Sequence, residues 1–173
     1  MLTVVSENDD PVLQTENWSM EEDTVLTIDV SDWGSDVDGD GLTYSSSDSR
    51  MEPTSDNTFD FEPIANYSGT TSVDLSVTDS TVTISSTFEI EVTAINDVPS
   101  INSLLELTAT ESQQLEYDIE VVDPDDDSFT YVLSSEPDGM VIDNTILTWT
   151  PSEGTSEIVT FNLTVSDDEA SVE

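Results

Sequence analysis

Apolar and polar residues alternate along most of this sequence. The alternation is strict over 73–77, 88–92 and 161–165, where an aliphatic residue or phenylalanine occupies every second position, and nearly regular over 25–30. A period of two is typical of strands that bury one face. We therefore predict strands at 13–20, 25–30, 42–46, 58–61, 72–78 and 87–95, and again at 101–108, 115–122, 129–134, 140–142, 146–150 and 160–166.

Segments rich in Ser, Thr, Asp, Gly and Pro separate these strands, and no helical period interrupts them. Asp143 and Asn144 are predicted to form a turn, because both residue types tolerate positive φ. The pattern predicts an all-β chain of two tandem Greek-key β-sandwiches, cadherin-like or Ig-like. Trp149, Tyr131 and Leu133 are expected in the second core.

The strand pattern repeats after about 90 residues, which divides the chain. Residues 11–97 are predicted to form the first sandwich and 98–173 the second, while residues 1–10 resemble the end of a preceding repeat and a linker. No last strand is evident for the second sandwich. We expect either a window cut from a longer array, or donor-strand addition in which residues 1–6 of another copy supply that strand.

Acidic and amide residues recur in the same order in both units, at offsets of about 87–89 residues. A repeat of this regularity indicates a tandem array of one domain type. The first set is Asn8, Asp9, Glu22, Asp36, Asp38, Asp40 and Asp79, and the second is Asn96, Asp97, Glu111, Asp123, Asp125, Asp127 and Asp167.

These repeated residues offer oxygen ligands, which suit Ca²⁺. Calcium accepts six to eight oxygens in flexible geometry, whereas magnesium demands near-octahedral geometry and zinc prefers imidazole and thiolate. The sequence has no His and no Cys. We therefore predict Ca²⁺ as the cofactor; the alternative is that these acids are solvated loop residues.

The sequence also contains motifs of a known group. The segments Asn8-Asp9-Asp10-Pro11, 22–28 and 36–44 resemble bacterial and archaeal cadherin-like tandem repeats, and 123–127, 139–140 and 147–151 are similar to the dystroglycan-type cadherin-like branch. The resemblance covers nearly the whole chain, with departures at Asp10, Gly41 and Asp126. It implies a rod of domains that calcium stiffens at the junctions.

Greek-key topology predicts where the repeated residues lie. The loop after the second strand and the loop before the last strand share one end of a sandwich, and the loop before the second strand lies at the other end. One junction is therefore predicted to gather Glu22, Asn96, Asp97, Asp123, Asp125, Asp127 and Asp167. Asn8, Asp9, Asp36, Asp38, Asp40 and Asp79 would form an N-terminal half-site, and Glu111 a C-terminal one.

Charge narrows the function further. The chain has 40 acidic residues and one basic residue, Arg50, for a formal charge of −39. Such self-repulsion opposes compaction unless cations neutralise or screen it. It excludes nucleic acid and anionic membrane surfaces as partners. Without His, Cys or Lys there is no histidine triad, thiol nucleophile or Schiff-base lysine, so we do not expect an enzyme.

Two further motifs occur in the chain. Asp36, Asp38, Asp40 and Gly41 match the first positions of an EF-hand loop, but Ser47 stands where a bidentate Glu is needed and a strand follows instead of a helix. Three sequons make Asn17, Asn66 and Asn162 candidates for N-glycosylation.

These observations predict a calcium-rigidified structural or extension repeat of a large extracellular surface protein or adhesin. Its partners would be neighbouring repeats, or copies of itself arranged head to tail. One alternative is a subunit of a head-to-tail extracellular filament or surface layer. Another is a calcium-dependent adhesion module that binds carbohydrate, such as surface glycans, or protein.

Overall fold

A computed structural model describes residues 1–5, 7–102, 106–125, 128–155 and 158–173. The chain divides into two compact units, unit 1 (Met1–Ile95) and unit 2 (Asn96–Glu173), each of which is described by itself. Strands form the regular structure of both units. Within the described ranges no helix is long and apolar enough to cross a membrane.

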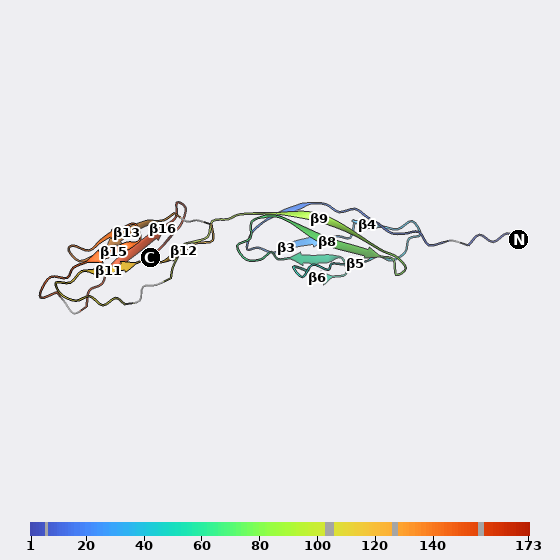
Figure 1. Cartoon of the computed structure of the whole chain (residues 1–173). Coiled ribbons are helices and arrows are strands. Elements are labelled where there is room, and N and C mark those ends of the chain that lie inside the picture. The colour runs from blue at the N-terminus through green and yellow to red at the C-terminus, as the bar shows by residue number, and fades with distance from the viewer. Residues whose placement is uncertain (6, 103–105, 126–127, 156–157) are drawn as a thin grey trace. The chain divides into compact units, whose positions relative to one another are not determined.

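Unit 1 is a sandwich of two sheets. The larger sheet has the order β2 (Trp18–Glu21), β9 (Thr83–Thr93), β8 (Gly69–Thr78), β5 (Thr43–Ser45), and the smaller one β3 (Leu26–Asp29), β7 (Thr58–Phe61), β6 (Met51–Ser55). A short ribbon pairs β1 (Val12–Leu13) with β4 (Gly34–Ser35). The β8–β9 hairpin is the longest feature of the unit (Figure 1). The β2–β9 pairing is parallel and the other pairings are antiparallel.

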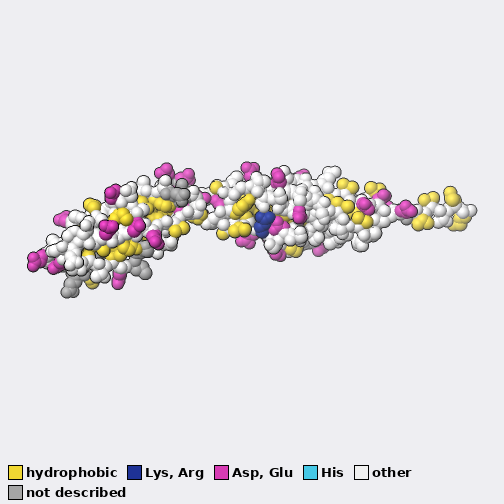
Figure 2. Space-filling view, in the orientation of Figure 1, with side chains coloured by type: hydrophobic (Ala, Val, Ile, Leu, Met, Phe, Trp, Pro, Cys, Tyr) yellow, Lys and Arg dark blue, Asp and Glu magenta, His cyan; other side chains and the backbone are white. Residues whose placement is uncertain are grey.

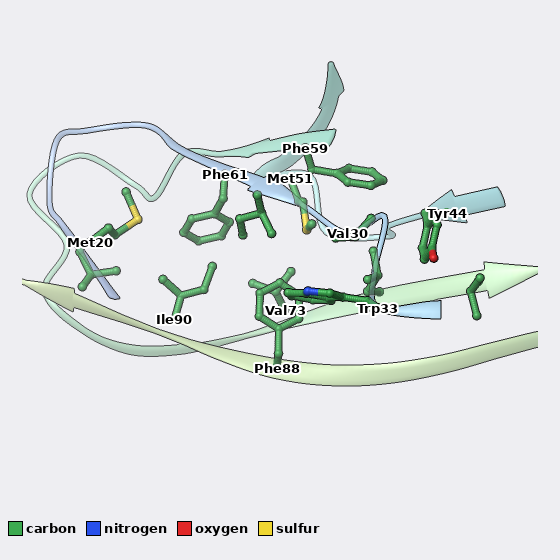
Figure 3. Close-up of a cluster of buried hydrophobic side chains, with 14 residues drawn as sticks. Met20, Val30, Trp33, Tyr44, Met51, Phe59, Phe61, Val73, Phe88 and Ile90 are labelled. Atoms are coloured by element: carbon green, nitrogen blue, oxygen red, sulfur yellow. The ribbon is translucent and has the colours of Figure 1, made fainter. Parts of the chain in front are cut away.

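The core of unit 1 lies between its two sheets. Figure 3 shows Phe61 of the smaller sheet facing Ile90 of the larger one. The Trp33 and Phe88 rings meet edge to face with centroids 5.2 Å apart. Such a contact adds specific geometry to the burial of two large rings. The apolar positions of the alternating segments therefore face one another between the sheets, where Phe61 and Ile90 have no exposed area.

Unit 2 repeats the antiparallel pairings of unit 1. One sheet has the order β13 (Thr130–Ser134), β16 (Asn162–Ser166), β17 (Ser171–Val172), and the other β11 (Leu115–Asp118), β15 (Ile146–Trp149), β14 (Val141–Asp143). A short ribbon joins β10 (Ser100–Ile101) and β12 (Val121–Val122). Tyr131 opposes Val165 as Tyr44 opposes Val77 in unit 1. Among the described residues of unit 2, the parallel β2–β9 pairing has no counterpart.

The all-β tandem-sandwich prediction is confirmed, and several strand boundaries differ from it. The segments 13–20 and 115–122 each divide into two strands that join different sheets. Of the described residues in 101–108, only Ile101 lies in a strand. Sequence patterns did not predict β6, because four of its five residues are exposed and Pro53 interrupts it at a register shift. Proline is tolerated at such an edge position.

The predicted turn and the second core are both present. Asn144 has φ 53°, between β14 and β15, which confirms the turn. Trp149 is buried in the core of unit 2, and Tyr131 and Leu133 pack against that core while keeping some exposure. Burial raises the pKa of the Tyr131 phenol, and the charge of Asp118 adds to the effect.

Arg50, which supplies the dark blue atoms of Figure 2, joins the connection between the two sheets of unit 1 to β8. Its guanidinium donates to both carboxylate oxygens of Asp48, at 3.0 and 2.6 Å, and to Thr71 Oγ1 at 2.8 Å. It also lies 5.2 Å from the centroid of the Phe61 ring. The hydrogen bond from the Arg50 guanidinium lowers the pKa of Asp48, so both side chains of this pair stay charged.

Candidate metal centre

Asp79 occupies the turn of the β8–β9 hairpin, where the fold buries its carboxylate. Its Oδ1 accepts hydrogen bonds of 2.7 Å from the backbone N–H groups of Thr81 and Val82. Its Oδ2 accepts the side-chain amide of Asn8 at 2.9 Å. The hydrogen bond from the Val82 N–H lowers the pKa of Asp79 most, and the hydrogen bond from the Asn8 amide lowers it further. Asp79 therefore remains ionised at neutral pH.

The aspartate triplet forms a loop closed on Asp36. Asp36 Oδ1 accepts from the N–H groups of Asp38 at 2.8 Å and Asp40 at 3.3 Å. The N–H of Asp9 donates to Asp38 Oδ2 at 2.7 Å. We call Asn8, Asp9, Asp36, Asp38, Asp40 and Asp79 the acidic set of unit 1. Its hydrogen bonds fasten the segment before β1 to the loop after β4 and to the hairpin turn.

The geometry of this set fits a divalent cation. Asp36, Asp38 and Asp40 each direct one carboxylate oxygen to a point where all three lie within 4.8 Å of one another. Two oxygens on opposite sides of a calcium ion, each about 2.4 Å from it, are about 4.8 Å apart. The spacing of the three carboxylate oxygens therefore suits a calcium ion between them. Asp36 Oδ2 is buried and has no hydrogen-bond partner among the described residues. A buried anionic oxygen without a partner is costly, and a cation would satisfy it.

Unit 2 carries the same network. Asn96 Nδ2 donates to Asp167 Oδ2 at 3.2 Å, the N–H of Asp97 to Asp125 Oδ2 at 2.8 Å, and the N–H of Asp125 to Asp123 Oδ1 at 2.8 Å. The Ala170 N–H bond lowers the pKa of buried Asp167. These five residues, Asn96, Asp97, Asp123, Asp125 and Asp167, are the acidic set of unit 2; the predicted ligand Asp127 lies outside the described residues.

Glu22 lies at the far end of unit 1 from its acidic set. Asp79 follows the Thr78–Thr83 pair of the β8–β9 hairpin, whereas Glu22 contacts the chain beyond Thr93 at the opposite end. Its Oε1 accepts from the N–H of Ile95 at 2.9 Å, and its side chain is only 3% exposed. A buried carboxylate is thereby fixed beside the residue that directly precedes Asn96 in the chain.

Glu111 does not repeat the contacts of Glu22. Its Oε1 accepts from the N–H of Gly154 at 2.8 Å. The matching bond in unit 1 joins the N–H of Asn66 to Asp23 Oδ1 at 2.9 Å, again across 43 residues. In this structure Glu111 therefore fixes a loop as Asp23 does. Sequence reasoning missed Asp23, because nothing in its neighbourhood distinguishes it from the adjacent acid.

The three sequons have different surroundings. Asn17 Oδ1 accepts from the N–H of Glu89 at 2.9 Å and so holds the segment before β2 against β9. Asn66 is exposed in a turn with φ 57°. Asn162 is exposed at the start of β16. Glycosylation at these positions remains a prediction.

Comparison with known proteins agrees with this architecture. The model of the bacterial Ig domain family matches residues 8–93 and again residues 96–173. The chain belongs to the bacterial Ig domain family. The two bacterial Ig domains coincide closely with the two units of the structure. No curated protein sequence matches the chain.

Solved structures with the same architecture include cadherin ectodomains. The pair of domains resembles human protocadherin-24 EC1-2, with a TM-score of 0.57, 18% identity, and coverage of 91% of this chain and 87% of that one. For Drosophila N-cadherin EC1-4 the TM-score is 0.57 and the identity 15%, over 95% of this chain and 48% of that one. At these identities the likeness shows the fold alone.

An endo-fucoidan hydrolase from glycoside hydrolase family 107 also matches, with a TM-score of 0.46 and 22% identity over 94% of this chain. The two bacterial Ig domains span 27% of that enzyme's length. A TM-score at this level supports no statement about activity.

Proposed function

We propose that this chain is an extension module of an extracellular surface protein or adhesin, in which calcium binds the acidic end of each unit and stiffens the connection to the unit before it. The observation that carries this proposal is the duplicated hydrogen-bond network. Asn8, Asp9 and Asp79 in unit 1 have the same partners as their equivalents in unit 2. A solvated acidic surface would have no reason to repeat a network bond for bond.

The electrostatics of each acidic set support a cation. Unit 1 brings five carboxylates together, and the sequence has no Lys or His to neutralise them. Arg50, its one basic residue, is engaged with Asp48. Carboxylates held this closely repel one another, so ion binding would lower the free energy of the folded state as well as neutralise the set.

The linker is the mechanical element. The N–H groups of Asp9 and Asp97 donate to carboxylates of their own triplets, so each bond holds a linker residue that carries a carboxylate beside its triplet. Bound calcium would supply a multidentate bridge between linker and triplet carboxylates. In the proposal Glu22 adds a carboxylate from the preceding unit; its support is the Ile95 bond, one residue before Asn96.

We infer a structural role instead of a catalytic one. The family match covers both units, and the sequence has no His, Cys or Lys to act as a general base or a covalent nucleophile. An extracellular position is part of the proposal. Its support is the fold shared with cadherin ectodomains, together with a composition that requires abundant cations.

Calorimetric titration with CaCl₂ tests the proposal, on chelator-treated protein at about 1 M NaCl, where the Debye length is about 3 Å and diffuse screening is saturated. The matched variants are Asp38→Asn and Asp125→Asn, with Asp74→Asn, an exposed carboxylate on β8, as control. We expect saturable binding that each site variant weakens at least tenfold and the control leaves unchanged. Heats that never saturate, or equal loss in all three variants, would refute the proposal.

A further inference from the structure

The connection that follows β3 in unit 1 is two residues longer than the one that follows β11 in unit 2. Val30 and Ile119 are equivalent, because each N–H donates at 2.9 Å to the carbonyl directly before the next strand of its sheet, β7 or β15. Trp33 and Glu120 are also equivalent, because each carbonyl accepts from the residue directly after β1 or β10, at 2.8 and 2.9 Å. Two residues separate Val30 from Trp33, whereas Glu120 directly follows Ile119. Glu120 therefore occupies the place that Trp33 has in unit 1.

This exchange opens the second sandwich beside Glu120. The Trp33 side chain is 7% exposed and belongs to the core of unit 1, whereas Glu120 is exposed. A carboxylate cannot replace an indole in an apolar interior, because burying an unpaired charge is costly. Tyr131, the counterpart of the 8% exposed Tyr44, is accordingly only half-buried. A groove of about 680 Å³ lies in unit 2 at this place, and all of its described lining residues fall within 102–145.

Carboxylates and aromatic rings line this groove together. Asp118 and Glu120 contribute the carboxylates, and Phe129 and Tyr131 contribute rings that pack against the core and stay partly exposed. Burial and then the charge of Asp118 raise the pKa of the Tyr131 phenol, so a carboxylate lies close to this ring. The single basic residue of the sequence, Arg50, belongs to unit 1. The groove is therefore both anionic and aromatic.

Unit 1 shows how such partners hold a guanidinium group. Arg50 donates to both carboxylate oxygens of Asp48 and lies 5.2 Å from the centroid of the Phe61 ring. A planar cation suits these two partners, because it forks onto a carboxylate and is attracted to the face of a ring. The groove of unit 2 offers the same two kinds of partner, and the sequence has no second Lys or Arg to occupy it.

We propose that this groove binds an arginine side chain of a partner protein. Asp118 and Glu120 would accept hydrogen bonds from its guanidinium group, and the rings of Phe129 and Tyr131 would form the aromatic wall. Arginine suits the groove better than lysine, because its planar and weakly hydrated group both stacks on rings and forks onto carboxylates. The formal charge of −39 attracts a basic partner from a distance, and the groove gives that attraction a fixed docking point.

Arginine binding in the groove does not rest on calcium binding. None of the described residues that line the groove belongs to the acidic set of unit 2. The groove also lies within one unit and needs no neighbouring repeat. This proposal and the proposed function can therefore fail separately.

A peptide titration followed by ¹⁵N–¹H NMR tests the proposal, at about 0.15 M NaCl, where the Debye length of about 8 Å limits diffuse attraction. The probe is acetyl-Gly-Arg-Gly-amide. Its control is the same peptide with citrulline, which keeps a planar end group but carries no charge. The arginine peptide should shift the amide signals of Phe129, Tyr131 and Thr145 saturably, and the citrulline peptide should bind at least tenfold more weakly. The amide of Asn162, on β16 outside the groove, should not move.

Single-charge variants separate the groove from general attraction to a polyanion. Asp118→Asn and Glu120→Gln each remove one lining carboxylate and should weaken the arginine peptide at least threefold. Glu116→Gln removes the same charge from an exposed position of β11 outside the groove and should bind like wild type. All three positions are exposed, so the variants should keep the wild-type fold and dispersed spectra.

Three results would overturn the proposal. Equal affinity for the citrulline peptide would assign the groove to a neutral ligand. Equal losses in all three variants would show diffuse attraction alone. An arginine peptide that leaves the groove signals unmoved in wild type would show that the groove holds no guanidinium group, and this last result needs no variant to fold.

Discussion

Asn8 donates its side-chain amide to Asp79 at 2.9 Å across 71 residues of chain, and Asn96 makes the same bond to Asp167 at 3.2 Å across the same separation. In both units an amide before the first strand is fixed to a buried aspartate in a β-hairpin turn. What recurs is therefore a network of hydrogen bonds as well as an order of residue types. The network holds each acidic set in place before any ion binds.

Asn8→Ala should lower the free energy of unfolding of unit 1 by about 1 to 2 kcal/mol, since it removes a part-buried hydrogen bond to a charged group. A Trp149→Phe background leaves Trp18 and Trp33 as fluorescent reporters of unit 1 alone. Denaturant unfolding of that protein gives the value. Asn162→Ala, an exposed position in unit 2, is the control and should leave the midpoint unchanged.

The stability supplied by Asp79 should disappear in acid. Its folded-state pKa is below the ordinary value of 3.8, so its contribution is fully present above that pH and falls as the unfolded state takes up the proton first. Relief of the overall negative charge changes stability in acid too, but it affects wild type and Asp79→Asn almost equally. In chelator, the wild-type advantage should therefore be larger at about pH 6 than at about pH 3. A pH-independent advantage would contradict this assignment.

Arg50→Lys should cost about 2 kcal/mol of unit 1 stability although it keeps the positive charge. Lysine cannot reproduce the fork that joins both oxygens of Asp48 while contacting Thr71. Unfolding midpoints in low and high salt measure the effect. Because the pair is largely shielded from solvent, most of the loss should persist in salt; an Arg50→Lys variant as stable as wild type would show that charge alone suffices.

Gly34→Ala should destabilise unit 1 by about 1 to 3 kcal/mol through overpacking. A Cβ at this position would lie 2.5 Å from Tyr44 Oη and 2.8 Å from Leu42 Cδ1. Tyr44→Phe removes the nearer atom, so the cost of Gly34→Ala should be smaller in that background. A double-mutant cycle measures this coupling, and simple additivity of the two changes would argue against the clash.

Much of the fold could be predicted from the sequence because both sandwiches bury one face of each strand. Strict alternation over 73–77 and 88–92 identified the hairpin that carries Asp79. β6 escaped prediction because it is an edge strand with little burial, so its sequence carries no periodic signal. The pattern also predicts a start for β9 at residue 87, whereas the strand begins at Thr83. Thr83, Ser85 and Thr87 are polar residues on its exposed face.

The residues of the acidic sets could be predicted from the sequence, but the hydrogen bonds among them could not. Residue spacing identified the triplets and the late aspartates, whereas the bond from the Asp9 N–H to Asp38 depends on backbone geometry that composition does not encode. The equivalence of Glu22 and Glu111 in the sequence did not extend to their contacts. Glu22 bonds to Ile95 beyond β9, and Glu111 bonds to the loop at Gly154.

The most direct measurement is a calcium titration followed by ¹⁵N–¹H NMR in chelator-treated protein at about 1 M NaCl. The amide signals of Asp9, Asp38, Asp97 and Asp125 report the two acidic sets, because each of these groups donates to a carboxylate of a triplet. The Ser31 amide donates to Asp29 at 2.9 Å outside both sets and is the internal control. The account predicts saturable shifts of the four site amides with an unmoved Ser31. Equal, non-saturating drift of all five signals would contradict it.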